Sequence, residues 1–166
     1  MTTLIELDLE FDFSDAIDAI QFDDDATHGH STMKRVDFIA EYEDCYRFIE
    51  VKDPDIPGAT GQETFVNKLT SGTLVTSLAG KYRDSILFRY LAGKSDKKID
   101  YIVLLSMAAL DPALLLNKQD ELHRAIPLDH GEWRNPSARS CVVLNLAQYK
   151  NHFGEGSVRR ISDGGV

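Results

Sequence analysis

The sequence predicts an α/β fold in which a mixed β-sheet, built around a central antiparallel hairpin, is flanked by helices. Residues 35–53 contain two segments rich in Val, Ile, Phe and Tyr, separated by a short polar break, which is the pattern of a β-hairpin. Residues 62–92 carry apolar side chains at helical spacing, and residues 99–107 form a continuous apolar run typical of a buried strand. This alternation of strands and helices favours one layered domain over residues 1–166.

Length and composition are those of an ordinary globular domain. The chain has 166 residues, of which 43% are hydrophobic and 27% are charged, so it can bury enough surface to fold without disulfides or a structural metal. The two cysteines are far apart, which excludes a disulfide scaffold. The longest apolar run, at 102–110, is too short to cross a bilayer, and the first residues lack the features of a signal peptide. We therefore expect a cytoplasmic protein that does not associate with membranes.

Charge is distributed unevenly along the chain. The formal net charge is −9, which argues against broad nonspecific binding to nucleic acid, because affinity for phosphates comes from basic side chains. Residues 1–60 carry a net charge of −12, whereas residues 61–166 carry +3, with six bases between Lys81 and Lys98. The N-terminal acids are typical of a solvated face and of turns. The alternative is that some of these carboxylates surround a cation.

The residues before the hairpin predict a strand, a helix and a loop. Residues 4–13 alternate apolar and acidic side chains, which is the period of a half-exposed strand. Ser14 is a favourable N-cap for a short helix over residues 14–22, with Asp15 in its first turn. Residues 23–32 are polar and show no periodicity, so we expect a loop there.

Glycine and proline delimit the segments after the hairpin. Two prolines and two glycines predict a loop at 54–61, and Gly72 is expected to divide or kink the long helical segment. Asp111 and Pro112 open a predicted helix that continues to about Arg124, since proline is tolerated in the first turn.

The C-terminal part of the sequence is less regular. Residues 140–146 predict another buried strand, and the chain from there to Val166 is polar and poorly periodic. We therefore expect a core at about 4–107, an extension with a helix and a strand at 108–150, and a polar tail at 151–166.

The hairpin brings acidic and basic side chains to one face. Side chains alternate along a strand, so Asp37 lies on one face of the first strand, and Glu50 and Lys52 share a face of the second. A turn that pairs residues 42 and 45 places Asp37 opposite Glu50, and a turn that pairs 43 and 46 places Asp37 opposite Lys52. Both registers put the three side chains on the same face, and only an odd-length turn separates them.

Two carboxylates and an ammonium group on one face are suited to binding a metal ion and a water molecule. Carboxylate oxygens are hard ligands that suit Mg²⁺ or Mn²⁺, and the Val51 carbonyl lies between Glu50 and Lys52 as a further ligand. Such a metal neutralises charge on a phosphodiester and acidifies water, while Lys52 is placed to orient that water. The alternative is a structural hairpin with an exposed ion pair, which contributes less than about 1 kcal/mol.

The spacing of these residues resembles the PD-(D/E)xK nuclease superfamily, which includes restriction endonucleases, Holliday-junction resolvases and many phage-defence nucleases. Asp37 is followed by twelve residues and then by Glu50-Val51-Lys52 at the end of an apolar strand. The resemblance implies a restriction-endonuclease-like core with a helix, a three-stranded antiparallel meander, a second helix and a further strand. It covers about half of the chain, at 14–107, with residues 4–12 as a candidate for the missing meander strand.

The resemblance also implies the roles of the site residues. Asp37 and Glu50 would hold Mg²⁺ or Mn²⁺, and Lys52 would position the nucleophilic water. The first helix of such nucleases usually supplies one more carboxylate, and the next helix often supplies an assisting polar side chain. The candidates, between which the sequence does not decide, are Glu10, Asp15 and Asp18 for the carboxylate and Lys81 or Gln62 for the polar side chain.

The sequence therefore predicts a metal-dependent endonuclease that hydrolyses DNA phosphodiester bonds, in phage defence or DNA processing. The basic stretch would contact DNA phosphates through Lys81, Arg83 and Arg89. The acidic total favours a second hypothesis, a noncatalytic protein-interaction module or assembly subunit built on the same fold. A third is an accessory protein whose hairpin is purely structural. A protein partner or a homodimer is compatible with each of these.

Overall fold

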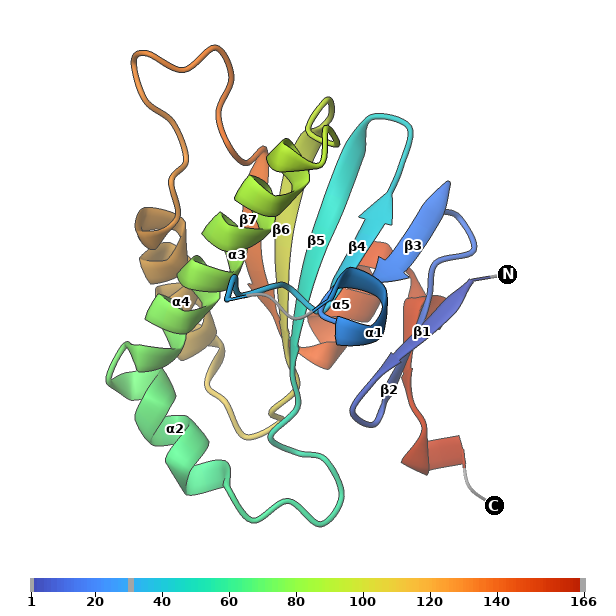
Figure 1. Cartoon of the computed structure of the whole chain (residues 1–166). Helices are drawn as coiled ribbons and strands as arrows, with labels where there is room; N and C mark the ends of the chain where they lie inside the picture. The colour runs from blue at the N-terminus through green and yellow to red at the C-terminus, as the bar shows by residue number, and fades with distance from the viewer. Residues whose placement is uncertain (1, 30–31, 165–166) are drawn as a thin grey trace.

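The chain folds around a five-stranded mixed sheet (Figure 1). The computed structural model describes residues 2–29 and 32–164. Neighbouring strands in the sheet follow the order β3 (Asp18–Gln21), β4 (Phe38–Glu41), β5 (Cys45–Lys52), β6 (Lys98–Leu105) and β7 (Ser140–Leu144). The first three strands form an antiparallel meander, and β6 and β7 run parallel to β5. This confirms the predicted α/β class, with a mixed sheet, a central antiparallel hairpin and flanking helices.

Helices cover one face of this sheet (Figure 1). They are α2 (Gln62–Thr70), α3 (Thr73–Leu91) and α4 (Pro112–Ala125). In α3, Leu74, Leu78 and Tyr82 are buried at four-residue spacing, so they form one apolar stripe that packs on the strands. No helix in the described part of the chain is both long and apolar enough to cross a membrane.

A second, smaller sheet packs on the opposite face. Its strands follow the order β1 (Thr3–Glu6), β2 (Leu9–Asp12) and β8 (Val158–Arg160), and α5 (Leu146–Phe153) packs beside it. The shared core includes Phe11 from β2, Phe38 from β4 and Tyr149 from α5. The remaining short elements are α1 (Asp25–His28) and two 3-10 turns, Glu155–Ser157 and Ser162–Gly164.

The structure corrects the predictions for the N-terminal segment. The alternating residues 4–13 form two strands, because the chain reverses at Leu7 and β1 pairs with β2. The predicted helix at 14–22 is wrong, since residues 18–21 pair with β4 as β3. Backbone pairing with a neighbouring strand outweighs the weak helical preference of a short segment. Thus β3, and not residues 4–12, is the third strand of the meander.

The C-terminal predictions also need correction. Of the predicted polar tail at 151–166, the described residues 151–164 contain regular structure, because the end of α5 lies there and β8 pairs with β2. The predicted strand at 140–146 ends at Leu144, since the next residue, Asn145, begins α5 with a capping box. The polar loop at 23–32 contains the short helix α1.

The other predicted elements are confirmed in type and approximate position. The hairpin at 35–53 is β4 and β5, and the loop at 54–61 is present. The predicted strand at 99–107 is β6, and the helix opened by Pro112 is α4. Gly72 separates α2 from α3, with φ at +80°, a left-handed conformation that a side chain disfavours.

Replacing Gly72 by alanine is expected to lower the free energy of unfolding by about 1 kcal/mol, or to lower Tm by roughly 2–4 °C. A Cβ at Gly72 meets no atom within 4 Å, so the cost comes from the backbone alone. Gly61→Ala is the matched control, because Gly61 has equally open surroundings but a φ of −103°. Thermal unfolding checks both variants, and equal effects would contradict the explanation.

Candidate active site

Asp37 and Glu50 face each other across the β4–β5 hairpin. The observed register pairs Phe38 with Ile49, which sets Asp37 opposite Glu50 at the start of β4. Two backbone contacts hold Asp37 there. The Val51 amide donates to Asp37 Oδ2 at 2.6 Å, and the Phe22 amide donates to the Asp37 carbonyl at 2.7 Å. Of the two registers that the sequence allows, the structure therefore has the one with residues 42 and 45 paired.

Two lysines reach the carboxylate pair from different elements. Lys81 lies on α3, and its Nζ is 3.1 Å from Asp37 Oδ1 and 2.7 Å from Glu50 Oε1. Lys52 Nζ, two residues along β5, is 2.5 Å from the same Glu50 oxygen and 3.2 Å from the Val51 carbonyl. The predicted convergence of Asp37, Glu50 and Lys52 on one face is thus confirmed. Their catalytic roles stay a prediction.

The site is buried, and its surroundings disfavour the ionised form of Glu50. The Glu50 side chain is fully buried, and burial raises its pKa to about 7, with Asp37 adding to the rise while Lys52 and Lys81 oppose it. Burial also acts to lower the pKa of Lys81, but the Glu50 and Asp37 carboxylates outweigh it and raise that pKa. Glu50 Oε2 is buried and has no hydrogen-bond partner among the described residues. An unpaired buried carboxylate oxygen is costly unless a ligand uses it.

Two further carboxylates, Glu6 and Asp23, lie close to the pair. The Gln21 amide donates to Glu6 Oε2 at 3.1 Å and to Asp23 Oδ1 at 3.5 Å. Burial raises the pKa of Glu6 to about 7, with additional effects of Asp37 and Asp23. Burial and then the Asp37 charge raise the pKa of Asp23. These carboxylates therefore share the electrostatic field of the site.

The sequence analysis missed both residues for identifiable reasons. Glu6 reaches the site only because the chain reverses after it, and the unbroken alternation of 4–13 hides that turn. Asp23 belongs to an acidic run, Asp23-Asp24-Asp25, which is typical of a solvated loop. Asp23 lies just after residues 18–21, which pair with the hairpin, and this position is the signal that points to its place near the site.

The assisting carboxylates expected from the first helix are located elsewhere. Glu10 lies in β2 and forms an ion pair with Arg159. Asp15 accepts a hydrogen bond from Tyr42, and Asp18 pairs with the opposite end of β4. Within residues 2–29 and 32–164, neither these three nor the exposed Gln62 forms a hydrogen bond or ion pair with Asp37 or Glu50. The prediction fails because the helix that was to carry the carboxylate is a strand.

The three basic residues assigned to DNA binding have different environments. Lys81 bridges the carboxylates, and Arg83 is exposed on α3. Arg89 is buried, with its guanidinium 4.7 Å from the centre of the Tyr46 ring, so it is not accessible to a phosphate. The assignment of Arg89 to DNA is therefore wrong, because the helical period turns it toward the sheet.

The donors present fit a magnesium or manganese ion that also binds substrate. Among the described residues, no group of three or more His, Cys, Asp or Glu side chains is arranged to hold a metal. Mg²⁺, however, is commonly bound by one or two carboxylates, with waters and substrate phosphates completing its shell. Asp37 and Glu50 supply two carboxylates, the Val51 carbonyl is adjacent, and Glu50 Oε2 is an available oxygen.

A cavity of about 520 Å³ adjoins the site, and we call it the α2 groove. It opens between the β1–β2 turn and α2, at the end of β5. Lys52 lines the groove and is bonded to Glu50, so the groove borders the lysine side of the site. Its walls include Glu6, Leu7, Thr64, Phe65 and Lys68.

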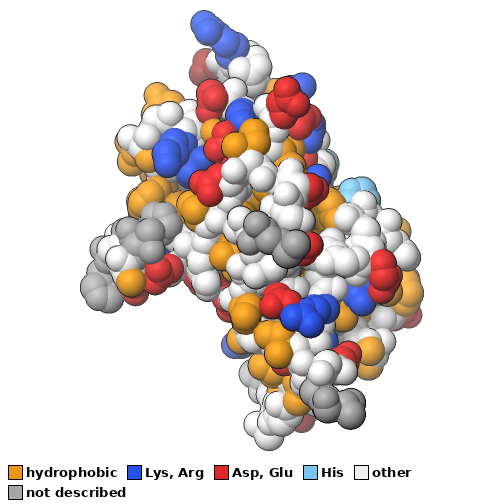
Figure 2. Space-filling model, turned by 90° about the vertical axis from the view of Figure 1, so that its right-hand side faces the viewer, with side chains coloured by type: hydrophobic (Ala, Val, Ile, Leu, Met, Phe, Trp, Pro, Cys, Tyr) orange, Lys and Arg blue, Asp and Glu red, His pale blue; other side chains and the backbone are white. Residues whose placement is uncertain are grey.

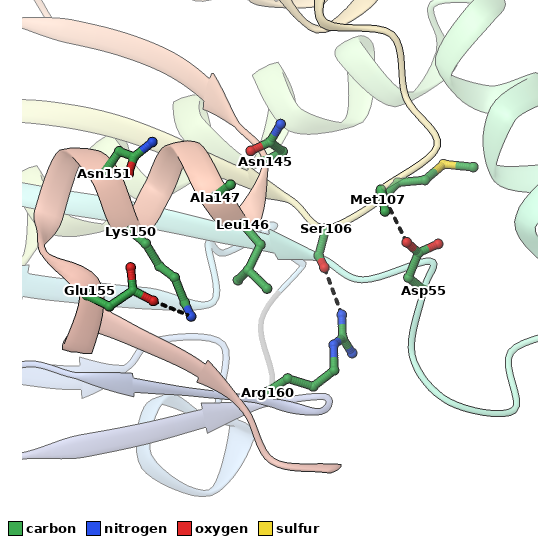
Figure 3. A pocket seen from close by; sticks show the side chains of 11 residues that line it. Asp55, Ser106, Met107, Asn145, Leu146, Ala147, Lys150, Asn151, Glu155 and Arg160 are labelled. Carbon is green, nitrogen blue, oxygen red and sulfur yellow. Dashed lines mark hydrogen bonds and ion pairs between the residues drawn. The ribbon is translucent and has the colours of Figure 1, made fainter. Parts of the chain in front are cut away.

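A larger cavity of about 630 Å³ lies beyond the ends of β6 and β7 (Figure 3). Arg160 points into this region and donates to Ser106 Oγ at 2.8 Å. The same guanidinium forms two hydrogen bonds of 2.8 Å with the Asp53 carboxylate, just after β5. These contacts tie β8 to the five-stranded sheet, which accounts for the polar groups at this end of the molecule.

Comparisons with known proteins give one structural likeness. No protein-family model and no curated protein matches the chain. The small subunit of the heterodimeric restriction endonuclease R.BspD6I is similar to it with a TM-score of 0.41 and 14% sequence identity. The matched region covers 85% of this chain and 60% of that subunit, so the chain spans less than two thirds of the subunit's length.

Proposed function

We propose that the chain is a metal-dependent nuclease that hydrolyses DNA phosphodiester bonds, with Asp37 and Glu50 as the metal ligands. The observation that carries the proposal is the convergence of these two carboxylates with Lys52 and Lys81 beside an open groove. The buried, unpartnered Glu50 Oε2 supports it further. When bound, Mg²⁺ or Mn²⁺ would supply positive charge to the phosphate and acidify a nucleophilic water.

The remaining chemistry belongs to the chain's own side chains. In the hydrolysis, water forms a new P–O bond and gives up a proton, while the bond to the leaving oxygen breaks and that oxygen takes up a proton. Lys52 is 30% exposed beside Glu50, so its ammonium group is placed to orient water and to offset negative charge on the reacting phosphate. Lys81 is a positioning residue, because its charge holds two carboxylates together that would otherwise repel each other.

Cleavage assays test this function directly. Wild-type protein is incubated with linear, nicked and branched DNA in Mg²⁺ or Mn²⁺, and we expect metal-dependent cleavage that falls at least about 100-fold in Asp37→Asn and Glu50→Gln. Glu41→Gln is the matched control, because Glu41 is also ion-paired, with Lys97 at 2.6 Å, but lies at the end of β4 away from Asp37, which immediately precedes that strand. Equal activity of Glu50→Gln and wild type would overturn the assignment.

One observation favours a second candidate, a noncatalytic interaction module on the same fold. The Lys81 ammonium lies between both carboxylates, so the cluster is also a self-sufficient ion-pair network. Under this alternative, no DNA is cleaved and Mn²⁺ leaves Tm unchanged in wild type and in Asp37→Asn alike. A protein partner or a second copy would then be the ligand of interest.

A further inference from the structure

We propose that the α2 groove binds an unpaired DNA strand, with Lys68 on the phosphate backbone and with Leu7 and Phe65 against the bases. This inference builds on the proposed nuclease function, because Lys52 lines the groove and is bonded to Glu50, one of the two proposed metal ligands. It specifies the substrate of that site as a single strand or a frayed end rather than an intact duplex.

Leu7 is the first observation behind this proposal. It is the one residue other than glycine with a positive φ in the described chain, at +56°, and its half-exposed side chain lines the groove. A bulky residue costs free energy in this conformation, and a two-residue hairpin turn is better served by Asn or Gly. The cost of this backbone conformation is explained if the exposed Leu7 side chain contacts a ligand in the groove. Phe65 faces the same cavity from α2.

The charge of the groove is the second observation. Lys68 is exposed on α2 and lines the groove, and no carboxylate pairs with it among the described residues. Lys52 also lines the groove, but its ammonium group is already bonded to Glu50. Of the acids in the walls, Asp53 is already bonded to Arg160, and Glu6 accepts a hydrogen bond from the Gln21 amide. Lys68 is therefore the cation of the groove that can receive a phosphate, although the chain as a whole is acidic.

The apolar walls of the groove and the mixed charge of the molecular surface favour an unpaired strand. In a duplex the bases are stacked inside, so apolar walls can contact them only after unstacking. Proteins that bind duplexes neutralise many phosphates with an extended basic surface. The side of the molecule that carries β1 and β2 shows basic, acidic and hydrophobic side chains interspersed instead (Figure 2). A short unpaired segment needs only the few groups that the groove provides.

Binding measured without cleavage tests the inference. The full-length Glu50→Gln protein is titrated, without divalent metal, into a fluorescein-labelled single-stranded oligonucleotide and into its blunt duplex, and anisotropy is followed over a range of salt concentrations. We expect at least tenfold tighter binding of the single strand. Adding Lys68→Ala should weaken it about fivefold and reduce the slope of log K against log salt by about 0.7, the loss of one phosphate contact.

Two more variants separate a ligand contact from a structural effect. Asparagine tolerates the left-handed backbone conformation at this turn, so Leu7→Asn should leave Tm unchanged or raise it. We expect the same variant to bind the single strand about fivefold more weakly. Lys94→Ala removes an exposed lysine beyond α3 and should leave affinity and salt slope unchanged. Equal or tighter binding of the duplex, or equal effects of Lys68→Ala and Lys94→Ala, overturns the inference. If the wild-type protein binds the single strand tightly but cleaves no DNA, the nuclease function is overturned and the inference about the groove is retained.

Discussion

Replacing Glu50 by glutamine is expected to raise the stability of the protein at pH 8 while abolishing its stabilisation by Mn²⁺. Burial raises the pKa of Glu50 from 4.5 to about 7, so the folded protein keeps this proton over a pH range in which the unfolded chain has released it. The stability that Glu50 contributes is therefore complete below about pH 4.5 and is lost as pH rises through 7. Glutamine carries no charge and avoids this loss.

The size of the effect follows from the shift. One pKa unit corresponds to 1.36 kcal/mol, so the gain in Glu50→Gln reaches at most about 3 kcal/mol above pH 7 and is small near pH 4.5. Each kcal/mol corresponds to roughly 2–4 °C in Tm for a chain of this size. Thermal unfolding from pH 4.5 to 8 measures it. A variant that is less stable than wild type at pH 8 would show that the two lysines stabilise ionised Glu50 more than burial destabilises it.

Mn²⁺ supplies the second half of this prediction. A metal competes with the proton on Glu50, so stabilisation of wild type by Mn²⁺ should grow between pH 6 and pH 8, and it reaches about 2.7 kcal/mol at a free concentration 100-fold above Kd. Glu50→Gln should show none of this increase, whereas Glu41→Gln should behave as wild type. An equal response of all three proteins to Mn²⁺ would place the ion elsewhere.

Truncating Phe11 to alanine is expected to destabilise the protein by about 3–5 kcal/mol. Phe11 is fully buried between the two sheets, and its ring centre is 5.2 Å from that of Phe38 and 5.7 Å from that of Tyr149. The variant loses contacts with β4 and α5 at once and leaves a cavity that this close-packed layer cannot fill. Urea unfolding followed by circular dichroism measures the loss.

The control for this variant lies on the neighbouring strand. Ile5 is on β1, and 51% of its side chain is exposed, so Ile5→Ala should change stability by no more than about 0.5 kcal/mol. Similar, small effects of Phe11→Ala and Ile5→Ala would mean that the second sheet contributes little to the core. A single cooperative transition in wild type is expected, because the two sheets share one apolar layer.

Local patterns carried the predictions that the structure confirms. The hairpin is specified by two β-rich segments around a short polar break, and the break between α2 and α3 by a glycine in the left-handed region. The side-chain period of a strand is two residues, so Asp37 and Glu50 share a face in both registers with an even-length turn, and only an odd-length turn would separate them. The turn length alone was open, and the observed pairing of Phe38 with Ile49 selects one of the two registers.

The failed predictions concern elements whose identity depends on a distant partner. Residues 18–21 have a weak intrinsic preference and become a strand because β4 offers an open edge. β8 forms because β2 is available to pair with it, about 150 residues earlier in the chain. Neither partner is visible in a local window of sequence.

The sequence by itself determined the α/β class and the hairpin, since both follow from short-range periodicity, and it placed Asp37, Glu50 and Lys52 on one face for any even-length turn. The observed pairing of Phe38 with Ile49 supplied that condition. Only the tertiary structure decided what surrounds these three side chains. Lys81 is 44 residues from Asp37 in the chain and reaches it because the apolar stripe of α3 packs on the sheet. Glu6 arrives with a hairpin whose register is set by backbone pairing. Packing and strand pairing act between segments far apart in the sequence, and residue spacing does not record them.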